Sequence, residues 1–347
     1  MYPISNLDAI LLRMKSDVSL SYAQTKEELL SPVAEELAQV EVELKSYTDS
    51  AFPLIGEINQ YIHESGGKRL RPAVLLLVSR LCGAGGYEII KLGTIVELIH
   101  VATLVHDDII DRADLRRGRP SVNARWGNEI TVLMGDWMYM TAFQIALELR
   151  NFRLLDVLIQ LTRTMVTGEM MQLAIGRSVA ISVDEQREIS MRKTAHLFAA
   201  CASLPAILSG TTATAEEGLE GYGRALGMAF QLTDDILDYT AEKRSLGKPV
   251  LTDLEEGKVT LPIILLFRKA NRPERQFLNR LALQGELSHE EKQEILSLIE
   301  RYQILGEARD AVRAYALEAM DRLSSFPASA ARESLMYLPA YILNRVE

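Results

Sequence analysis

The stretch that decides the fold reads Val-Glu-Leu-Ile-His-Val-Ala-Thr-Leu-Val-His-Asp-Asp-Ile-Ile-Asp and spans residues 96–111. Apolar residues recur along it at helical spacing without a turn residue, so it predicts one continuous helix. Asp107, Asp108 and Asp111 come at its end. On a helix, Asp107 and Asp111 lie on one side, about 40° apart, with Asp108 beside them. Crowded carboxylates repel one another unless a cation neutralises them, and hard divalent ions such as Mg²⁺ prefer oxygen ligands.

The same pattern returns at the end of a second apolar stretch, residues 226–238. Its aspartates, Asp234, Asp235 and Asp238, have the spacing of the first three. An isolated acidic run is often a solvated face. Both triplets here follow apolar helices, where carboxylates are almost never buried unless they are paired or bound to metal. We therefore expect the two clusters to face each other across a bundle and to hold several Mg²⁺ ions.

The composition of the 347-residue chain favours one large domain over residues 1–347, because no linker-like segment interrupts it. Hydrophobic residues make up 48% of the chain, which allows a sizeable core. A net charge of −9 and a pI of about 5.3 argue against a nucleic-acid partner. Cys82 and Cys201 suit a reducing compartment as small core residues. Without a signal peptide or a run of 18 apolar residues, we expect a cytoplasmic protein with no transmembrane segment.

Helical periodicity dominates the chain, and alternating β-branched runs are nearly absent. The fold class is therefore all-α, a helical bundle of ten or more helices around a central active-site cavity, with residues 1–50 as peripheral N-terminal helices. Residues 112–128 and 241–258 read as loops. The expected helices span one or two segments of 5–47 and then 51–63, 73–82, 129–149, 152–176, 184–210, 216–240, 261–268, 288–302, 304–324 and 330–343.

Basic residues cluster before the first aspartate stretch and after both. Those in the segment before the first one stand at a Gly-Gly turn and a helix start, where backbone N–H groups and guanidinium forks suit phosphate oxygens. Any one of these residues would be ordinary surface on its own. Carboxylates, metal and basic side chains together are equipment for binding a diphosphate and stabilising it as a leaving group. The residues are Lys68, Arg69, Arg71, Arg116, Arg117, Lys248 and Lys258.

Six separated motifs together resemble one family, the all-trans polyprenyl diphosphate synthases of the long-chain type. They are Gly66-Gly67-Lys68-Arg69-Leu70-Arg71-Pro72, His106-Asp107-Asp108-Ile109-Ile110-Asp111, Arg116-Arg117-Gly118, Lys193-Thr194, Gln231-Leu232-Thr233-Asp234-Asp235-Ile236-Leu237-Asp238 and Gly257-Lys258. They occur in order between about residues 60 and 265.

The resemblance implies an isoprenoid synthase-like fold in a homodimeric prenyltransferase that joins isopentenyl diphosphate to an allylic diphosphate, such as farnesyl or geranylgeranyl diphosphate. It implies Mg²⁺ ligands at Asp107, Asp108, Asp111, Asp234, Asp235 and Asp238. It implies contacts to the allylic diphosphate from Arg116, Lys193, Gln231, Lys248 and Lys258. It implies contacts to isopentenyl diphosphate from Lys68, Arg71, His100 and Arg117.

The chemistry suits these residue types. Breaking the allylic C1–O bond places charge on the departing diphosphate, which metal and basic side chains stabilise as it forms. The cation that remains needs electron-rich neighbours that are not nucleophiles, and the side-chain oxygens of Thr194 and Gln231 meet that need. Attack by the double bond of isopentenyl diphosphate and loss of a proton complete the reaction. Water must be excluded because it would quench the cation.

Two histidines have competing interpretations. His100 lies seven residues before Asp107 and therefore on the same helix face, although a histidine there is also an ordinary core residue. His106 with Asp107 is also found in metal phosphohydrolases, but that chemistry needs several further histidine ligands. The chain has only five histidines, scattered along it, which disfavours the hydrolase.

Two small residues suggest how long the product becomes. Thr103 and Ala102 precede Asp107 by four and five residues, so we expect them about 6 to 8 Å below the metal. In short-chain relatives bulky aromatic residues at this level close the pocket, so small ones favour a long-chain product. The helix around Trp137, Met140, Thr141 and Phe143 offers large side chains that could form a floor, or could be ordinary core.

Three alternatives remain open. A short-chain synthase would make farnesyl or geranylgeranyl diphosphate with the same residues. A class I terpene cyclase also ionises an allylic diphosphate, but the second aspartate motif and the pair Lys68 and Arg71 oppose it. A subunit of a two-component synthase is the third: a regulatory subunit is free to lose its ligands, whereas this chain keeps them, and a catalytic subunit would need a partner for activity.

Overall fold

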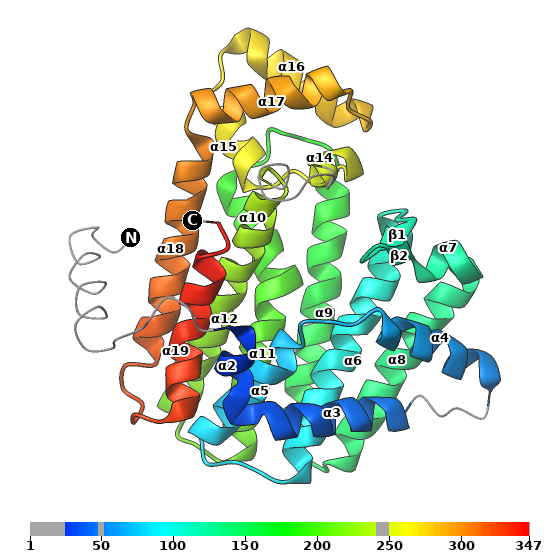
Figure 1. Ribbon diagram of the computed structural model, residues 1–347, viewed down its shortest axis with the longest axis vertical. Helices are drawn as coiled ribbons and strands as arrows, with labels where there is room; N and C mark the ends of the chain where they lie inside the picture. Colours follow the sequence, from blue (N-terminus) through cyan, green and yellow to red (C-terminus); the bar gives the residue numbers. More distant parts are fainter. Residues whose placement is uncertain (1–24, 48–51, 241–249, 347) are drawn as a thin grey trace.

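The computed structural model describes residues 25–47, 52–240 and 250–346, and these fold into a helical bundle (Figure 1). This confirms the all-α prediction. The elements are α2 Lys26–Leu30, η2 Ser31–Val33, α3 Ala34–Ser46, α4 Pro53–Glu64, α5 Leu70–Leu81, α6 Tyr87–Ile110, β1 Leu115–Arg116, β2 Arg119–Pro120, α7 Val122–Trp126, α8 Asn128–Glu148, α9 Phe152–Ile175, α10 Val183–Ser190, η3 Met191–Ala195, α11 His196–Leu208, α12 Ala213–Leu237, α14 Thr252–Glu256, α15 Leu261–Lys269, α16 Arg272–Gln284, α17 His289–Arg301, α18 Ile304–Arg322 and α19 Ala330–Leu343.

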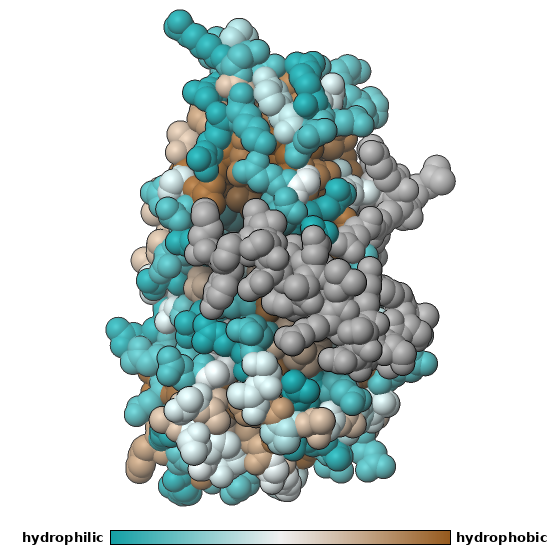
Figure 2. Space-filling view, turned by 90° about the vertical axis from the view of Figure 1, so that its left-hand side faces the viewer, coloured by the Kyte–Doolittle hydropathy of each residue, from teal (hydrophilic) through white to brown (hydrophobic). Residues whose placement is uncertain are grey.

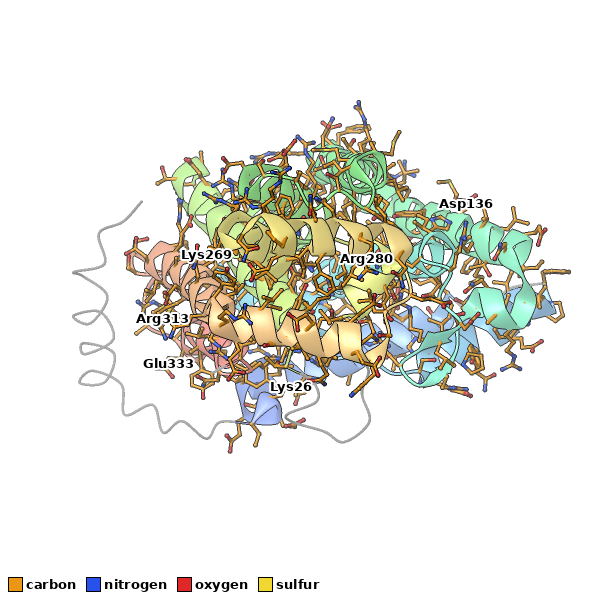
Figure 3. All side chains as sticks on the ribbon, turned by 90° about the horizontal axis from the view of Figure 1, so that it is seen from above. Lys26, Asp136, Lys269, Arg280, Arg313 and Glu333 are labelled. Carbon is orange, nitrogen blue, oxygen red and sulfur yellow. The ribbon has the colours of Figure 1, made fainter. Side chains whose placement is uncertain are left out.

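The two helices that carry the aspartate motifs run through the middle of the bundle. α6 packs along α8, and α12 packs along α11 and α18 (Figure 1). α11 and α5 are buried along almost their whole length, as expected of helices that are apolar on all sides. The aspartate ends of α6 and α12 point toward the same end of the bundle, below α16 and α17 in Figure 1. Seen from above, α16, which carries Arg280, and α17 lie over that end (Figure 3).

The described N-terminal helices lie on the outside of the bundle, and their inner faces belong to the core. Leu29, Val33 and Val40 are buried in the main apolar cluster. A Cβ on Gly93 of α6 would lie only 2.9 Å from Val40 Cγ2, so glycine lets α3 approach α6 closely. The remaining parts of the expected 1–50 segment, 1–24 and 48–50, lie outside the described residues.

Four elements differ from the sequence-based expectation. The expected loop 112–128 contains the β1–β2 hairpin and α7, and the expected loop 241–258 contains α14 in its described part. The expected helix 184–210 is three pieces, α10, the π-helix η3 and α11. α16 was not predicted. It begins with a capping box, in which Asn271 and Glu274 bind each other's backbone, and that pattern is its sequence signal.

α6 and α8 are long and apolar enough, by length and composition, to cross a membrane. The most apolar window of α6 is 67% buried, so α6 serves as a core helix of the bundle. That of α8 is 44% buried, which leaves an apolar face open. On the side of the molecule shown in Figure 2, polar residues cover most of the surface, with an apolar area beneath the uppermost helices.

Candidate active site

A cavity of about 1080 Å³ opens at the end of the bundle where α6 and α12 finish. α5, α6, α9, η3, α12 and the turn after α14 form its walls. Most of the predicted site residues line it: Lys68, Arg71, His100, Thr103, Asp107, Arg116, Arg117, Lys193, Thr194, Gln231, Asp234, Asp235 and Lys258. Asp108, Asp111, Asp238 and Ala102 do not line it, and Lys248 lies outside the described residues.

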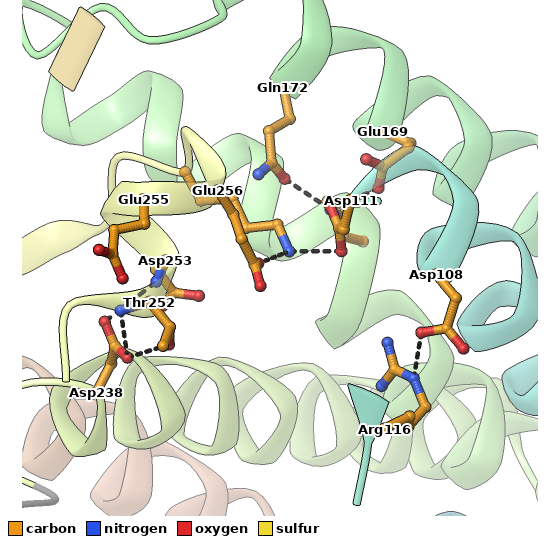
Figure 4. A network of polar contacts seen from close by, with 12 residues as sticks. Asp108, Asp111, Arg116, Glu169, Gln172, Asp238, Thr252, Asp253, Glu255 and Glu256 are labelled. Atoms are coloured by element: carbon orange, nitrogen blue, oxygen red, sulfur yellow. Dashed lines mark hydrogen bonds and ion pairs between the residues drawn. The ribbon is translucent and has the colours of Figure 1, made fainter. Parts of the chain in front are cut away.

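The first aspartate motif divides its three carboxylates between the cavity and two cations. Asp107 lines the cavity, and burial raises its pKa to about 6, against the opposing charge of Lys193. Asp108 is 2% exposed, and its Oδ1 accepts a hydrogen bond of 2.5 Å from Arg116 Nε (Figure 4). Asp111 Oδ2 lies 2.6 Å from Lys258 Nζ. A single carboxylate of this motif therefore faces the cavity directly.

The second aspartate motif also presents its members differently. Asp234 lines the cavity and lies 3.1 Å from Arg345 Nη1. Asp235 is 2% exposed; its Oδ1 accepts a hydrogen bond of 2.8 Å from Gln231 Nε2, and burial raises its pKa to about 7. Among the described residues, its Oδ2 has no hydrogen-bond partner. Asp238 instead accepts hydrogen bonds from Thr252 N (3.1 Å) and Asp253 N (3.3 Å), at the start of α14.

Lys258 connects the two motifs. Its Nζ lies 2.6 Å from Asp111, at the end of α6, and 2.8 Å from Glu256 of α14. Burial disfavours the ammonium, but these two carboxylates raise its pKa overall. Because α14 also binds Asp238 at the end of α12, one short helix holds the two acidic ends in one site.

The cavity carboxylates suit a hard divalent ion. Asp107, Asp234 and Asp235 line one cavity from two helices, and the unpartnered oxygen of Asp235 is a buried acceptor without a donor. Oxygen donors of this kind are those that Mg²⁺ takes, with water completing the shell. Within the described chain, no three His, Cys, Asp or Glu side chains lie close enough together to form a group that could hold an ion as they stand.

The π-helix η3 presents two predicted contacts to the cavity. Lys193 Nζ lies 2.5 Å from Glu169 Oε2 and 2.6 Å from Gln172 Oε1, both on α9. Thr194 Oγ1 donates to Gln231 Oε1 at 2.6 Å. Glycines on the flanking helices let the wider turn fit: a Cβ on Gly227 of α12 would lie 2.6 Å from Ala195 Cα. π-Helical turns of this kind often mark functional sites.

A second basic group lies on the α5 side of the cavity. Arg71 Nη1 lies 3.0 Å from His100 Nε2. Burial and then the charge of Arg71 hold the pKa of His100 well below its usual range, so the imidazole is neutral and its Nε2 accepts from the guanidinium. Arg69 begins α5 with φ +49 and binds Glu97, which is 4% exposed, at 2.6 Å. Glu97 thus supplies a buried negative charge behind several arginines.

Sequence reasoning missed several acidic and polar residues of the site. Glu97, Glu169, Gln172 and Asp253 line the cavity. The signal for Glu169 and Gln172 was available, because they stand three residues apart on one face of the otherwise apolar end of α9. Asp253 had no such signal, since it belongs to α14. Burial raises its pKa well above the usual range.

The two predicted chain-length residues, Thr103 and Ala102, lie in different surroundings. Thr103 lines the cavity, whereas Ala102 does not line it and packs in a second apolar cluster with Ile58 and Val105. The role of both residues in chain length stays a prediction. The suggested floor residues Trp137, Met140, Thr141 and Phe143 do not line the cavity either. Its apolar wall comes instead from α9, through Met165, Val166, Met170 and Leu173, and from Tyr139 of α8.

Comparison with known proteins identifies the family of the chain. The Polyprenyl synthetase family matches residues 52–299. Octaprenyl diphosphate synthase of Haemophilus influenzae is 36% identical over 307 residues, which cover 88% of this chain and 93% of that protein.

Two solved structures of polyprenyl synthases are similar to this chain over most of its length. A decaprenyl diphosphate synthase from Rhodobacter capsulatus matches with a TM-score of 0.89 and 33% identity, covering 93% of this chain and all of that one. A polyprenyl synthase from Caulobacter crescentus, complexed with calcium and isoprenyl diphosphate, matches with a TM-score of 0.87 and 33% identity, over 92% of this chain and 97% of that one. The chain belongs to the polyprenyl synthetase family and is a trans-prenyltransferase of the polyprenyl diphosphate synthase type.

Proposed function

We propose that the enzyme condenses an allylic diphosphate with isopentenyl diphosphate, in a Mg²⁺-dependent reaction, to make a long-chain all-trans polyprenyl diphosphate. One observation carries the proposal. Carboxylates from both aspartate motifs and two groups of cations line a single cavity. Calcium and isoprenyl diphosphate together in the Caulobacter structure support a divalent ion beside a diphosphate.

The allylic diphosphate binds at the acidic end of the cavity. Asp107, Asp234 and Asp235 would hold Mg²⁺ there, with Asp108, Asp111 and Asp238 available if their present partners release them. The bound ions would supply Lewis-acid neutralisation of the leaving diphosphate. Lys193, Lys258 and Arg116 surround the same end and donate hydrogen bonds to the diphosphate oxygens as their charge grows.

Carbon–carbon bond formation takes place between the two groups of cations. When the allylic C1–O bond breaks, its electron pair leaves with the diphosphate, and the oxygens of Thr194 and Gln231 face the cation. Lys68, Arg71, His100 and Arg117 hold isopentenyl diphosphate, whose double bond attacks that carbon. A proton then passes to the released diphosphate and restores the alkene. Bound substrates would have to displace water from the cavity, because water would quench the cation.

The apolar wall below the acidic end supports a long product. Thr103 is small, and Met165 and Val166 of α9 come about one helical turn before Glu169, which contacts Lys193, so they continue the wall away from the acidic end. A tail of prenyl units would pass between α6 and α9. A short-chain product remains the alternative; a bulky side chain at position 103 would favour it, whereas Thr103 is small.

A second copy of this chain is the partner that we propose. Exposed apolar residues that do not line the cavity lie on α8 and at the start of α9, including Leu133 (64% exposed), Met140 (63% exposed) and Phe152 (81% exposed). Large exposed apolar patches usually mark an interaction surface. Sedimentation at micromolar concentration should give a dimer of about twice the 38.8 kDa chain mass.

We further propose that residues 1–347 act as one domain that functions in the cytoplasm, without a transmembrane segment or a nucleic-acid partner. α18 and α19 extend beyond the family match, yet α18 packs along α12 and Tyr222 Oη donates to Leu335 O at 2.7 Å. Cys82 and Cys201 are both unpaired, which suits a reducing compartment.

The direct test supplies purified protein with farnesyl diphosphate, radiolabelled isopentenyl diphosphate and Mg²⁺, and sizes the products by chromatography. We expect long-chain polyprenyl diphosphates and no product after chelation. Products of 15 or 20 carbons would favour a short-chain synthase. Hydrocarbon from farnesyl diphosphate alone would identify a terpene cyclase, and activity only with a second protein would identify one subunit of a two-component enzyme.

A further inference from the structure

Arg177 lies just beyond the end of α9, and its guanidinium joins two other helices. Its Nη2 donates to Glu255 O at 3.0 Å, and its Nη1 donates to Ala282 O at 3.1 Å. Both carbonyls belong to last helical turns, because α14 ends at Glu256 and α16 at Gln284. Such carbonyls lack partners within their own helix, and a cation there also interacts favourably with the helix dipole.

The two helix ends leave room for the guanidinium by ending in glycine. A Cβ on Gly257 would lie 3.0 Å from Arg177 Cγ, and one on Gly285 would lie 3.4 Å from Arg177 Nη1. Both glycines have positive φ, +88 and +91, which other residues rarely adopt. The arginine therefore fills a slot between the ends of α14 and α16.

The turn beside this slot carries Lys258. Gly257 N donates to Leu254 O at 3.1 Å and Lys258 N donates to Asp253 O at 2.7 Å, which fixes the backbone from which Lys258 Nζ reaches Asp111. Glu255 strengthens the same junction, since its side chain accepts from Leu287 N (3.2 Å) and from Lys292 Nζ (2.8 Å). Figure 4 shows Glu255 and Glu256 on α14 beside Asp253.

We propose that Arg177 is a positioning residue for the allylic diphosphate. It clamps α14 to α16 and so fixes the turn that extends Lys258 into the cavity. The proposal rests on the proposed function in one respect, the contact of Lys258 with that diphosphate. Arg177 itself reaches backbone carbonyls, so it acts through Lys258.

The kinetic test compares Arg177→Met, which keeps the aliphatic volume, with Arg177→Lys, which keeps the charge but lacks the second arm of the fork. Arg280→Met is the matched control, because Arg280 is an exposed arginine of α16 that pairs with Glu291 at 3.0 Å. We expect Arg177→Met to raise the KM for the allylic diphosphate about tenfold, as loss of hydrogen bonds from a charged donor predicts. The allylic KM of Arg177→Lys should lie between those of the wild type and Arg177→Met. The allylic KM of Arg280→Met should equal that of the wild type.

The KM for isopentenyl diphosphate should change less than twofold in Arg177→Met, because Lys68 and Arg71 lie at the start of α5. Unchanged values for both substrates, or an equal rise in both, would overturn the proposal. An equal rise would indicate general loosening of the bundle.

Hydrogen exchange of the substrate-free protein separates the clamp from the chemistry. The amides of Gly257 and Lys258 should exchange faster in Arg177→Met and at the wild-type rate in Arg280→Met; unchanged exchange in Arg177→Met overturns the clamp. Lys258→Ala tests the proposed function on its own. If it leaves the allylic KM unchanged, Lys258 has no such role and the positioning proposal fails with it. Lys258→Ala could raise the allylic KM while Arg177→Met speeds amide exchange without raising that KM. This result would disprove the positioning role of Arg177 and leave the role of Lys258 standing.

Discussion

The two aspartate motifs share one spacing, but the first is neutralised by cations and the second is held mainly by neutral groups. Asp108 and Asp111 each pair with a basic side chain. Asp235 and Asp238 accept hydrogen bonds from an amide, a hydroxyl and backbone N–H groups instead. The same sequence pattern therefore gives different electrostatics at the two helix ends. Asp234 is the exception in the second motif, because it lies 3.1 Å from Arg345 Nη1. The difference therefore concerns the two aspartates that follow it, Asp235 and Asp238.

The largest effect should come from the cavity carboxylate of the first motif. Asp107→Ala removes a proposed metal ligand that contributes several kcal/mol to the transition state, so kcat should fall about a thousandfold or more. Steady-state assays at saturating Mg²⁺ measure the loss. Asp136→Ala is the control, since Asp136 also lines the cavity but belongs to neither motif. Retention of a tenth of the wild-type kcat would contradict the proposed role of Asp107.

A smaller effect should follow at the third aspartate of the second motif. Asp238 binds the start of α14, and loss of a helix cap costs about 1 to 2 kcal/mol. Asp238→Ala should therefore lower kcat/KM roughly tenfold, through displacement of α14. Thr252→Val, which removes the hydroxyl contact to Asp238 and keeps the two backbone contacts, should show part of the same loss. A thousandfold loss in Asp238→Ala alone would make Asp238 a metal ligand equivalent to Asp107.

The electrostatics of the second motif should also make the free energy of unfolding of the metal-free protein depend on pH. Burial raises the pKa of Asp235 to about 7 from its model-compound value of 3.8. The native state then binds more protons than the unfolded state between those values, so the free energy of unfolding falls as pH rises toward 7. The slope for one such group is at most about 1.4 kcal/mol per pH unit.

Urea denaturation in the presence of a chelator, at pH 5, 6, 7 and 8, measures this slope. Asp235→Asn cannot ionise and should reduce this slope, leaving the part due to Asp107, whose pKa burial raises to about 6. Asp136→Asn, at an exposed carboxylate, should leave the slope unchanged. A stability that rises with pH over this range in the wild type would contradict the stated cause.

Local patterns predicted most of the fold. The long helices were predictable because apolar periodicity and caps lie within each segment, as in α6 and α12. α14 was not, since its five residues depend on contact with Asp238 and Arg177, which come from other helices. The π-helix η3 depends in the same way on glycines of α9 and α12 that allow close approach.

For the site, the motifs identified which residues share the cavity but not which way each one faces. Asp107 and Asp108 are neighbours in sequence, yet one lines the cavity and the other is buried against Arg116. Thr103 and Ala102 are likewise neighbours in sequence, but Thr103 lines the cavity and Ala102 packs in the second apolar cluster. On a helix, adjacent residues differ by about 100°, so a sequence fixes such a choice only when the neighbouring helices are known.

The two aspartate motifs also differ in the residue that stands one helical turn before each of them. Thr103 stands four residues before Asp107, and Phe230 stands four residues before Asp234; both line the cavity. Because the position on α12 is already aromatic and lies against Arg71, the growing tail should pass along α6. Thr103→Phe should therefore shorten the products sized by chromatography while it changes the rate of the first condensation less than about tenfold, a limit of 1.4 kcal/mol.

Ala102→Phe is the matched control, because Ala102 has 0% exposure and packs away from the cavity. Overpacking there should cost about 1 to 3 kcal/mol of stability and leave the product length of the folded enzyme unchanged. Shorter products from Ala102→Phe but not from Thr103→Phe would place the tail on the α8 side of α6. Unchanged product lengths from both variants would show that the tail does not follow α6. The cavity-lining residues of α9 would then be the positions to test.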